Sequence, residues 1–202
     1  GRFNKDQLVG MKRGYIADWK ISEETFVGVH SDQQWWQHYY SNGVTISGIF
    51  DIEFKLPPVP SGTYEIRLGY TVNPERGVVQ AYLNNKPCGI PVDLRMYGTD
   101  PTIGWVEDTE DEEENIANDK AMHNRGYMKG MDCYRQWDSD HTLRANTNNL
   151  RRILVTQYLD SEETYRLRFR QVLDDPECYL SFDFIELCPK SVYGSPEGED
   201  IY

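Results

Sequence analysis

One short stretch of the sequence carries four aromatic side chains suited to ligand binding: Trp35, Trp36, Tyr39 and Tyr40. Their spacing of three to four residues places them on one face of a short helix. Sugar rings have apolar C–H faces that stack on flat aromatic rings, so an exposed face of this kind predicts a glycan site. The same face could instead pack on the body of the protein, because large aromatic side chains dominate cores.

A polar segment offers oxygen ligands for a hard cation, namely Asp138 and Asp140 in Trp137-Asp-Ser-Asp-His141. Calcium takes such ligands, although the spacing of known calcium loops is incomplete and a solvated loop explains the segment equally. The sequence therefore requires no cofactor, while leaving room for a structural calcium ion.

Arginines alternate with apolar residues at Arg166, Arg168 and Arg170, which predicts that they line the outer face of one strand. Such a row could clamp an acidic sugar or another anion. Alternatively, the arginines could form cross-strand ion pairs with a neighbouring strand that carries Asp51 and Glu53.

The common catalytic signatures are absent from the sequence. No phosphate-binding glycine loop, zinc-protease helix or serine-hydrolase elbow is found. The histidines are scattered, and among 33 acidic residues no catalytic carboxylate pair can be chosen from sequence. The chain is therefore not expected to be an enzyme, and a hydrolase is the residual alternative.

The elements that must position these residues are mainly strands. Alternation over 44–56, broken only at Ile49, and over 64–70 predicts two half-buried strands. Further strands are expected at 78–83, 153–156 and 165–170. The segment 179–187 is apolar on both faces and is predicted to be one central strand. Short strands separated by Gly, Pro and Asn turns indicate an all-β antiparallel sandwich.

Two short helices are predicted within insertions. The sequence Thr109-Glu-Asp-Glu112 fits a capping box, with Gly126 as the stop signal of the helix that follows, and Ser31 begins a similar pattern. We expect a single domain over residues 1–190 with an insertion at about 95–150, followed by a flexible tail at 191–202.

Charge and cysteine content limit the partners and the compartment. The formal net charge is −12, and seven acids lie within 107–114, so nucleic acid and anionic membrane surfaces are disfavoured. The acidic run could bind cations or a basic partner, or it could simply begin a solvated helix. A strand between Cys178 and Cys188 would hold them too far apart for a disulfide. Two alternatives remain: a Cys88–Cys133 disulfide, or four free thiols.

Two stretches resemble galactose-binding-like jelly rolls, the family that includes many carbohydrate-binding modules. The first runs over 62–94 with the hairpin Asn84-Asn-Lys-Pro-Cys-Gly89, and the second is Leu180-Ser-Phe-Asp-Phe-Ile-Glu-Leu187. The resemblance implies a jelly-roll fold over about 44–189. It also implies loop aromatics as ligand contacts, which adds Trp105 and Trp137, and a calcium ligand at Asp183.

The segments 115–130, 149–156 and 185–193 resemble the C-terminal domain of fasciclin-domain surface lipoproteins of Bacteroidetes. That resemblance implies an extracytoplasmic protein at the cell surface or outer membrane. It also implies that contact with the membrane is made only through a lipid anchor outside this sequence.

Together these features predict a non-catalytic binding module whose partner is a glycan. The alternative is a structural or adhesive domain that contacts a cell-surface protein or an upstream fasciclin domain.

Overall fold

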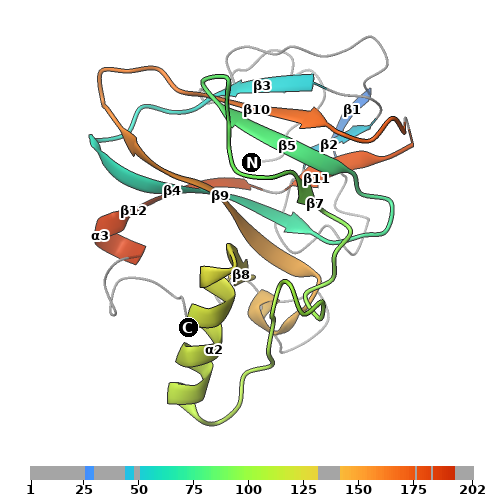
Figure 1. The fold of residues 1–202 in the computed structure, drawn as a ribbon, viewed down its shortest axis with the longest axis vertical. Helices are drawn as coiled ribbons and strands as arrows, with labels where there is room; N and C mark the ends of the chain where they lie inside the picture. Colours follow the sequence, from blue (N-terminus) through green and yellow to red (C-terminus); the bar gives the residue numbers. More distant parts are fainter. Residues whose placement is uncertain are drawn as a thin grey trace.

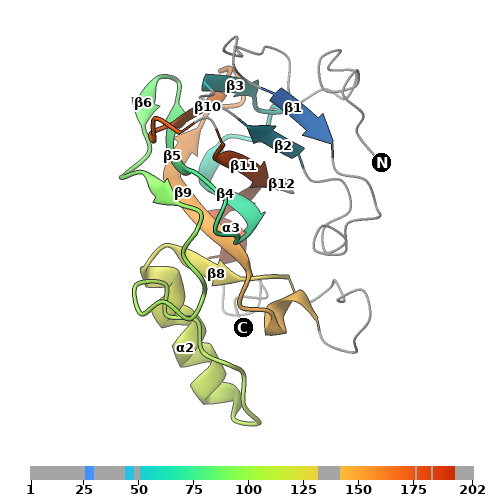
Figure 2. The same cartoon turned by 90° about the vertical axis from the view of Figure 1, so that its right-hand side faces the viewer.

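The computed structural model describes residues 26–29, 44–47, 51–131, 142–175, 177–182 and 184–193. Within these residues the strands are antiparallel and form two larger sheets that face each other, with a smaller sheet at one end (Figures 1 and 2). The predicted all-β antiparallel sandwich with short helices is confirmed.

The first large sheet, called the β10 sheet, has the order β3-β10-β5-β6, with β7 also paired to β5. Its strands are β3 (Asp51–Lys55), β10 (Arg166–Gln171), β5 (Val78–Leu83), β6 (Lys86–Pro87) and β7 (Val92–Asp93). Asn84 and Asn85 have positive φ angles of 46° and 65° between β5 and β6. These angles are those of a tight turn whose twist suits a hairpin.

The second large sheet, called the β4 sheet, has the order β12-β4-β9-β8. Its strands are β12 (Phe184–Pro189), β4 (Gly62–Thr71), β9 (Asn149–Leu159) and β8 (Tyr127–Lys129). The β4 sheet lies between the β10 sheet and helix α2 (Glu112–Asn124) in both views (Figures 1 and 2).

The smaller sheet joins β1 (Phe26–Val29), β2 (Val44–Ser47) and β11 (Tyr179–Phe182). Two predicted strands are wrong as single elements, because each is divided between two sheets. The stretch 44–56 contributes β2 to the small sheet and β3 to the β10 sheet. The stretch 179–187 contributes β11 to the small sheet and β12 to the β4 sheet. Among the described strands, each lies at an edge of its sheet and not at the centre, as had been predicted.

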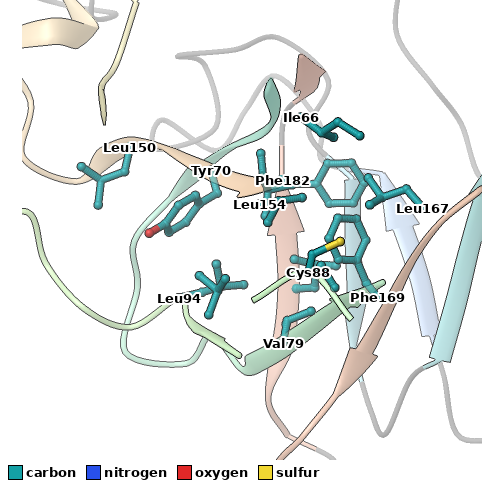
Figure 3. Packing of buried hydrophobic residues seen from close by; sticks show 14 of the residues in the cluster. Ile66, Tyr70, Val79, Cys88, Leu94, Leu150, Leu154, Leu167, Phe169 and Phe182 are labelled. Atoms are coloured by element: carbon teal, nitrogen blue, oxygen red, sulfur yellow. The ribbon is translucent and has the colours of Figure 1, made fainter. Parts of the chain in front are cut away.

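The core lies between the two large sheets. The alternating residues of β4 and β10 meet there, as predicted, together with those of β5. All of the following are at most 6 % exposed: Tyr64, Ile66, Leu68, Tyr70, Val79, Ala81, Leu83, Leu167 and Phe169. The rings of Phe169 and Phe182 lie 6.0 Å apart between their centroids (Figure 3). Burial of these apolar side chains is the main favourable term holding the sheets together.

The predicted helix in the insertion is confirmed as α2, but its N-cap is Asp111, two residues after Thr109. The Asp111 carboxylate accepts hydrogen bonds from the backbone N–H groups of Glu113 and Glu114. Gly126 follows the helix with a φ of +83°, a conformation that favours glycine. The predicted helix near Ser31 lies outside the described residues.

Two short helices complete the described chain, η2 (Leu143–Ala145) in the insertion and α3 (Lys190–Tyr193) after β12. Cys88, Cys178 and Cys188 are free thiols and are buried, while Cys133 lies outside the described part. No helix in the described ranges is long and apolar enough to span a membrane.

Candidate functional site

The outer face of the β10 sheet collects the charged side chains that alternate with its core residues. Arg166, Arg168 and Arg170 point away from the core, because Leu167, Phe169 and Gln171 between them are buried. The neighbouring strands add Asp51, Glu53 and Lys55 from β3 and Gln80 and Tyr82 from β5. We call this surface the open face, since most of its side chains are at least partly exposed, for example 36 % for Asp51 and 40 % for Arg166, although Glu53 is buried.

The arginines of the open face pair diagonally with the carboxylates of β3. Arg168 lies opposite Glu53 in the strand register, yet its guanidinium forms a two-pronged pair with Asp51, with Nε 2.5 Å from Oδ1. Arg166 likewise reaches past Lys55 to Glu53, 3.3 Å away. The hydrogen bonds to Asp51 raise the pKa of Arg168 above its ordinary value. The cross-strand alternative for these two arginines is therefore confirmed.

An aromatic ring and an amide complete the open face on its β5 side. The guanidinium carbon of Arg168 lies 5.2 Å from the centre of the Tyr82 ring, within the range of a cation–π contact. The Gln80 amide donates to the carbonyls of Ala81 and Gly89. Asp51, Arg168 and Tyr82 thus form a fixed row of carboxylate, guanidinium and phenol across three strands.

The outer face of the β4 sheet is equally charged but is buried, and we call it the covered face. Glu65 and Arg67 from β4 and Arg151 from β9 are at most 4 % exposed. Arg67 donates to Glu65 at 2.6 Å and lies 3.4 Å from Glu186 of β12. His123 of α2 pairs with Glu65 at 3.1 Å, and Arg67 lies 6.0 Å from the ring centre of Tyr193 in α3.

Helix α2 is attached by four charges that we call the α2 ring: Asp108, Asp119, Lys129 and Arg144. Asp119 lies 3.1 Å from Lys129 and 2.5 Å from Arg144, and Asp108 lies 2.5 Å and 2.6 Å from the same two cations. Burial alone would raise the pKa of Asp108, but hydrogen bonds from Arg144 and Lys129 hold it below its ordinary value. Asp108 belongs to the acidic run, so this member of the run has a structural partner.

Of the aromatic residues predicted to contact a ligand, only Trp105 lies within the described residues. Trp105 is half-buried, packs against the core, and has its ring centre 5.3 Å from Nζ of Lys129. Its indole thus contributes to packing and to a contact with Lys129. Its role in ligand binding stays a prediction. The other predicted aromatics lie outside the described residues: Trp35, Trp36, Tyr39, Tyr40 and Trp137.

Metal and nucleophile chemistry find no support in the part of the chain that the structure describes. No group of three or more metal-binding side chains occurs in it, and the predicted calcium ligands Asp138, Asp140 and Asp183 lie outside it. Burial raises the pKa of the Cys88 thiol to about 11. A thiol with so high a pKa is a poor nucleophile at neutral pH.

The sequence interpretation had named the arginines of the open face but had missed Tyr82 as their partner. The signal was present, because Tyr82 alternates with the buried residues Ala81 and Leu83 and must therefore point outward. What the sequence could not supply was the neighbour of β5, which the structure identifies as β10.

Comparison with known proteins finds likenesses only among solved structures. No known protein family and no curated protein matches this sequence. The solved structure of a Paenibacillus xanthan lyase matches 88 % of this chain with a TM-score of 0.47 and 11 % sequence identity. The chain spans only 13 % of that lyase. Nothing in these comparisons supports the resemblance to fasciclin-domain lipoproteins, which stays a prediction.

Proposed function

We propose that this chain is a non-catalytic carbohydrate-binding module and that the open face of the β10 sheet is its binding surface. The observation that carries the proposal is the fixed row of Asp51, Arg168 and Tyr82 on a partly exposed sheet face. The covered face offers similar side chains, but they are buried against α2 and α3.

The chemistry of the row suits a sugar. Hydroxyl groups both donate and accept hydrogen bonds, so a carboxylate and a guanidinium side by side can satisfy them in pairs. Because Arg168 is held by Asp51 and by the Tyr82 ring, little side-chain entropy is lost when a ligand binds. A sheet surface of this kind accommodates an extended chain of sugars better than a small molecule, which needs a concave site.

Other parts of the proposal rest on the sequence alone. The lack of catalytic signatures supports binding without turnover. The resemblance to surface lipoproteins supports an extracytoplasmic location, with a lipid anchor outside this sequence. The aromatic segment at Trp35–Tyr40 is a second candidate contact for the same glycan.

Affinity electrophoresis of the purified protein against a panel of neutral and acidic polysaccharides, with and without calcium, tests the proposal. A polysaccharide that retards the protein should lose about tenfold in affinity with Tyr82→Ala, because the substitution removes the cation–π contact that holds Arg168 in place. Tyr158→Ala is the matched control, because this tyrosine is 55 % exposed and belongs to β9 of the other sheet.

Two further outcomes discriminate between the alternatives. Loss of binding in Trp35→Ala and Trp36→Ala, but not in Tyr82→Ala, would move the site from the open face to the aromatic segment. No retardation by any polysaccharide would reject the carbohydrate proposal and favour the adhesive, protein-contacting role.

A further inference from the structure

The diagonal pairing on the open face leaves one arginine over. Arg166 forms an ion pair with Glu53, and Arg168 forms one with Asp51, although Asp51 lies directly opposite Arg170 in the register. Two residues before Asp51 the sequence has Ile49, which carries no charge. Arg170 is exposed and has no ion-pair partner within the described residues.

The open face is positive in a protein that is strongly negative. Lys55, Arg166, Arg168 and Arg170 outnumber Asp51 and Glu53 on it by two charges, whereas the whole chain carries a net charge of −12. A positive surface on an acidic chain attracts anions locally while the remainder of the molecule repels them. This contrast favours a partner whose negative charges are spaced along a chain and meet the protein on one face only.

Arg170 has the chemistry to recognise such a charge. A guanidinium presents parallel N–H groups that match the two oxygens of a carboxylate. Its neighbours in the register are Gln80 on β5 and Asp51 on β3, and both already have partners within the protein. Arg170, which lies beside Asp51 of the Asp51–Arg168–Tyr82 row, is therefore the guanidinium available to pair with the carboxylate of a ligand.

We propose that the open face binds an anionic polysaccharide, of the class built from uronic acids, and that Arg170 pairs with a sugar carboxylate. This inference rests on the proposed function. It adds to that function the ligand class and the residue that selects it.

The test compares two polysaccharides that share a backbone and differ in charge: polygalacturonate and the same polymer with its carboxylates methyl-esterified. Isothermal titration should show tighter binding to polygalacturonate, and Arg170→Gln should weaken that binding about tenfold or more while leaving the esterified polymer unaffected. Arg170→Lys keeps the charge but loses the planar fork, and it should also bind more weakly than the unmodified protein.

Lys120→Gln is the charge-matched control, because Lys120 is exposed on α2, on the far side of the β4 sheet. It should leave binding unchanged. Dextran and dextran sulfate form a second pair of probes, and preference for the sulfated polymer over polygalacturonate would assign the site to sulfate instead of uronate and overturn the class proposed. Since Arg170 is exposed, the variants should fold, which near-ultraviolet circular dichroism checks.

The two proposals fail in different ways. Equal binding of the charged and the esterified polymer would overturn the anionic assignment and leave carbohydrate binding intact. Equal losses in Arg170→Gln and Lys120→Gln would show a diffuse charge effect and would also overturn the role of Arg170. Absence of binding to every polymer would reject both proposals.

Discussion

The two outer faces of the sandwich carry the same kinds of side chain in different surroundings. On the covered face, Glu65 and Arg67 alternate with core residues of β4 and are closed off from water. On the open face, Arg166 and Arg168 alternate with core residues of β10 and stay partly exposed. The alternation that predicts a strand therefore does not reveal whether its polar side meets solvent or another layer of the protein.

The surroundings decide what each ion pair contributes. Removing one partner of a buried ion pair leaves the other charge buried with neither a partner nor water. An exposed pair gains little from Coulomb attraction, because water screens it. The covered face and the adjoining α2 ring should thus contribute to stability, and the open face should be free for binding. The predictions below test this division.

The largest effect is expected for Asp119→Ala in the α2 ring. The substitution leaves Lys129 and Arg144, which are 3 % and 8 % exposed, with Asp108 as their remaining carboxylate in the ring. Loss of one partner of a buried ion pair costs about 3–5 kcal/mol. Urea unfolding measures it, and the exposed Glu110→Gln is the control. A cost near that of Glu110→Gln would show that α2 is held by other contacts.

A smaller loss is expected for Gly69→Ala on the covered face. A Cβ atom at Gly69 would lie 2.3 Å from Cζ of Phe184, too close for any real contact. Displacing the ring should cost about 1–3 kcal/mol, the usual range for overpacking. Gly62→Ala on the same strand is the control, since its Cβ would meet Tyr64 at an ordinary 3.5 Å. Similar stability of the two variants would mean that Phe184 moves freely.

Acid should weaken the covered face through Glu65. Burial tends to raise the pKa of Glu65, but hydrogen bonds from His123 and Arg67 outweigh it and hold the pKa below its ordinary value of 4.5. Because the pKa of Glu65 is lower in the folded state than in the unfolded chain, its ionised carboxylate stabilises the fold at pH values above about 4.5. This contribution is lost as the pH falls through the lower, folded-state pKa. The free energy of unfolding should decrease below about pH 4.5, and less steeply in Glu65→Gln. Identical slopes for the two proteins would contradict this assignment.

The smallest effect is expected for Arg168→Gln on the open face. Its pair with Asp51 is 26 % and 36 % exposed, so the change should cost no more than about 1 kcal/mol in urea unfolding. Asp51→Asn should behave alike. A loss comparable to that of Asp119→Ala would show that the open face is structural and would remove the basis for binding there.

Much of the fold could be predicted from the sequence because alternation is a direct record of burial on one face. The core positions of β4 and β10 were identified in this way, and Gly126 correctly marked the end of α2, whereas the N-cap is Asp111 and not the predicted Thr109. The division of 44–56 and of 179–187 between sheets could not be predicted. The alternation over 44–56 and the apolar run over 179–187 contain no signal for a change of sheet, because neither pattern depends on which strand is the hydrogen-bonded neighbour.

The site was harder to predict than the fold. Aromatic residues were chosen by type, and five of the six lie outside the described residues, while Trp105 is partly used by packing. The relevant relation on the open face is the diagonal pairing of Arg166 with Glu53 and Arg168 with Asp51. This pairing depends on the register between β3 and β10, which are more than a hundred residues apart. No local pattern contains that register.

The order of strands has a consequence for the protein during its synthesis. The neighbours of β3 and β4 are β10, β9 and β12, all from the last third of the chain. While the ribosome is still producing the α2 insertion, the early strands have emerged without the partners that will pair with them. Because contacts distant in sequence form slowly, the nascent chain must carry these apolar strands unpaired until the final strands appear. The strand order therefore delays completion of both large sheets until the end of the chain has been made.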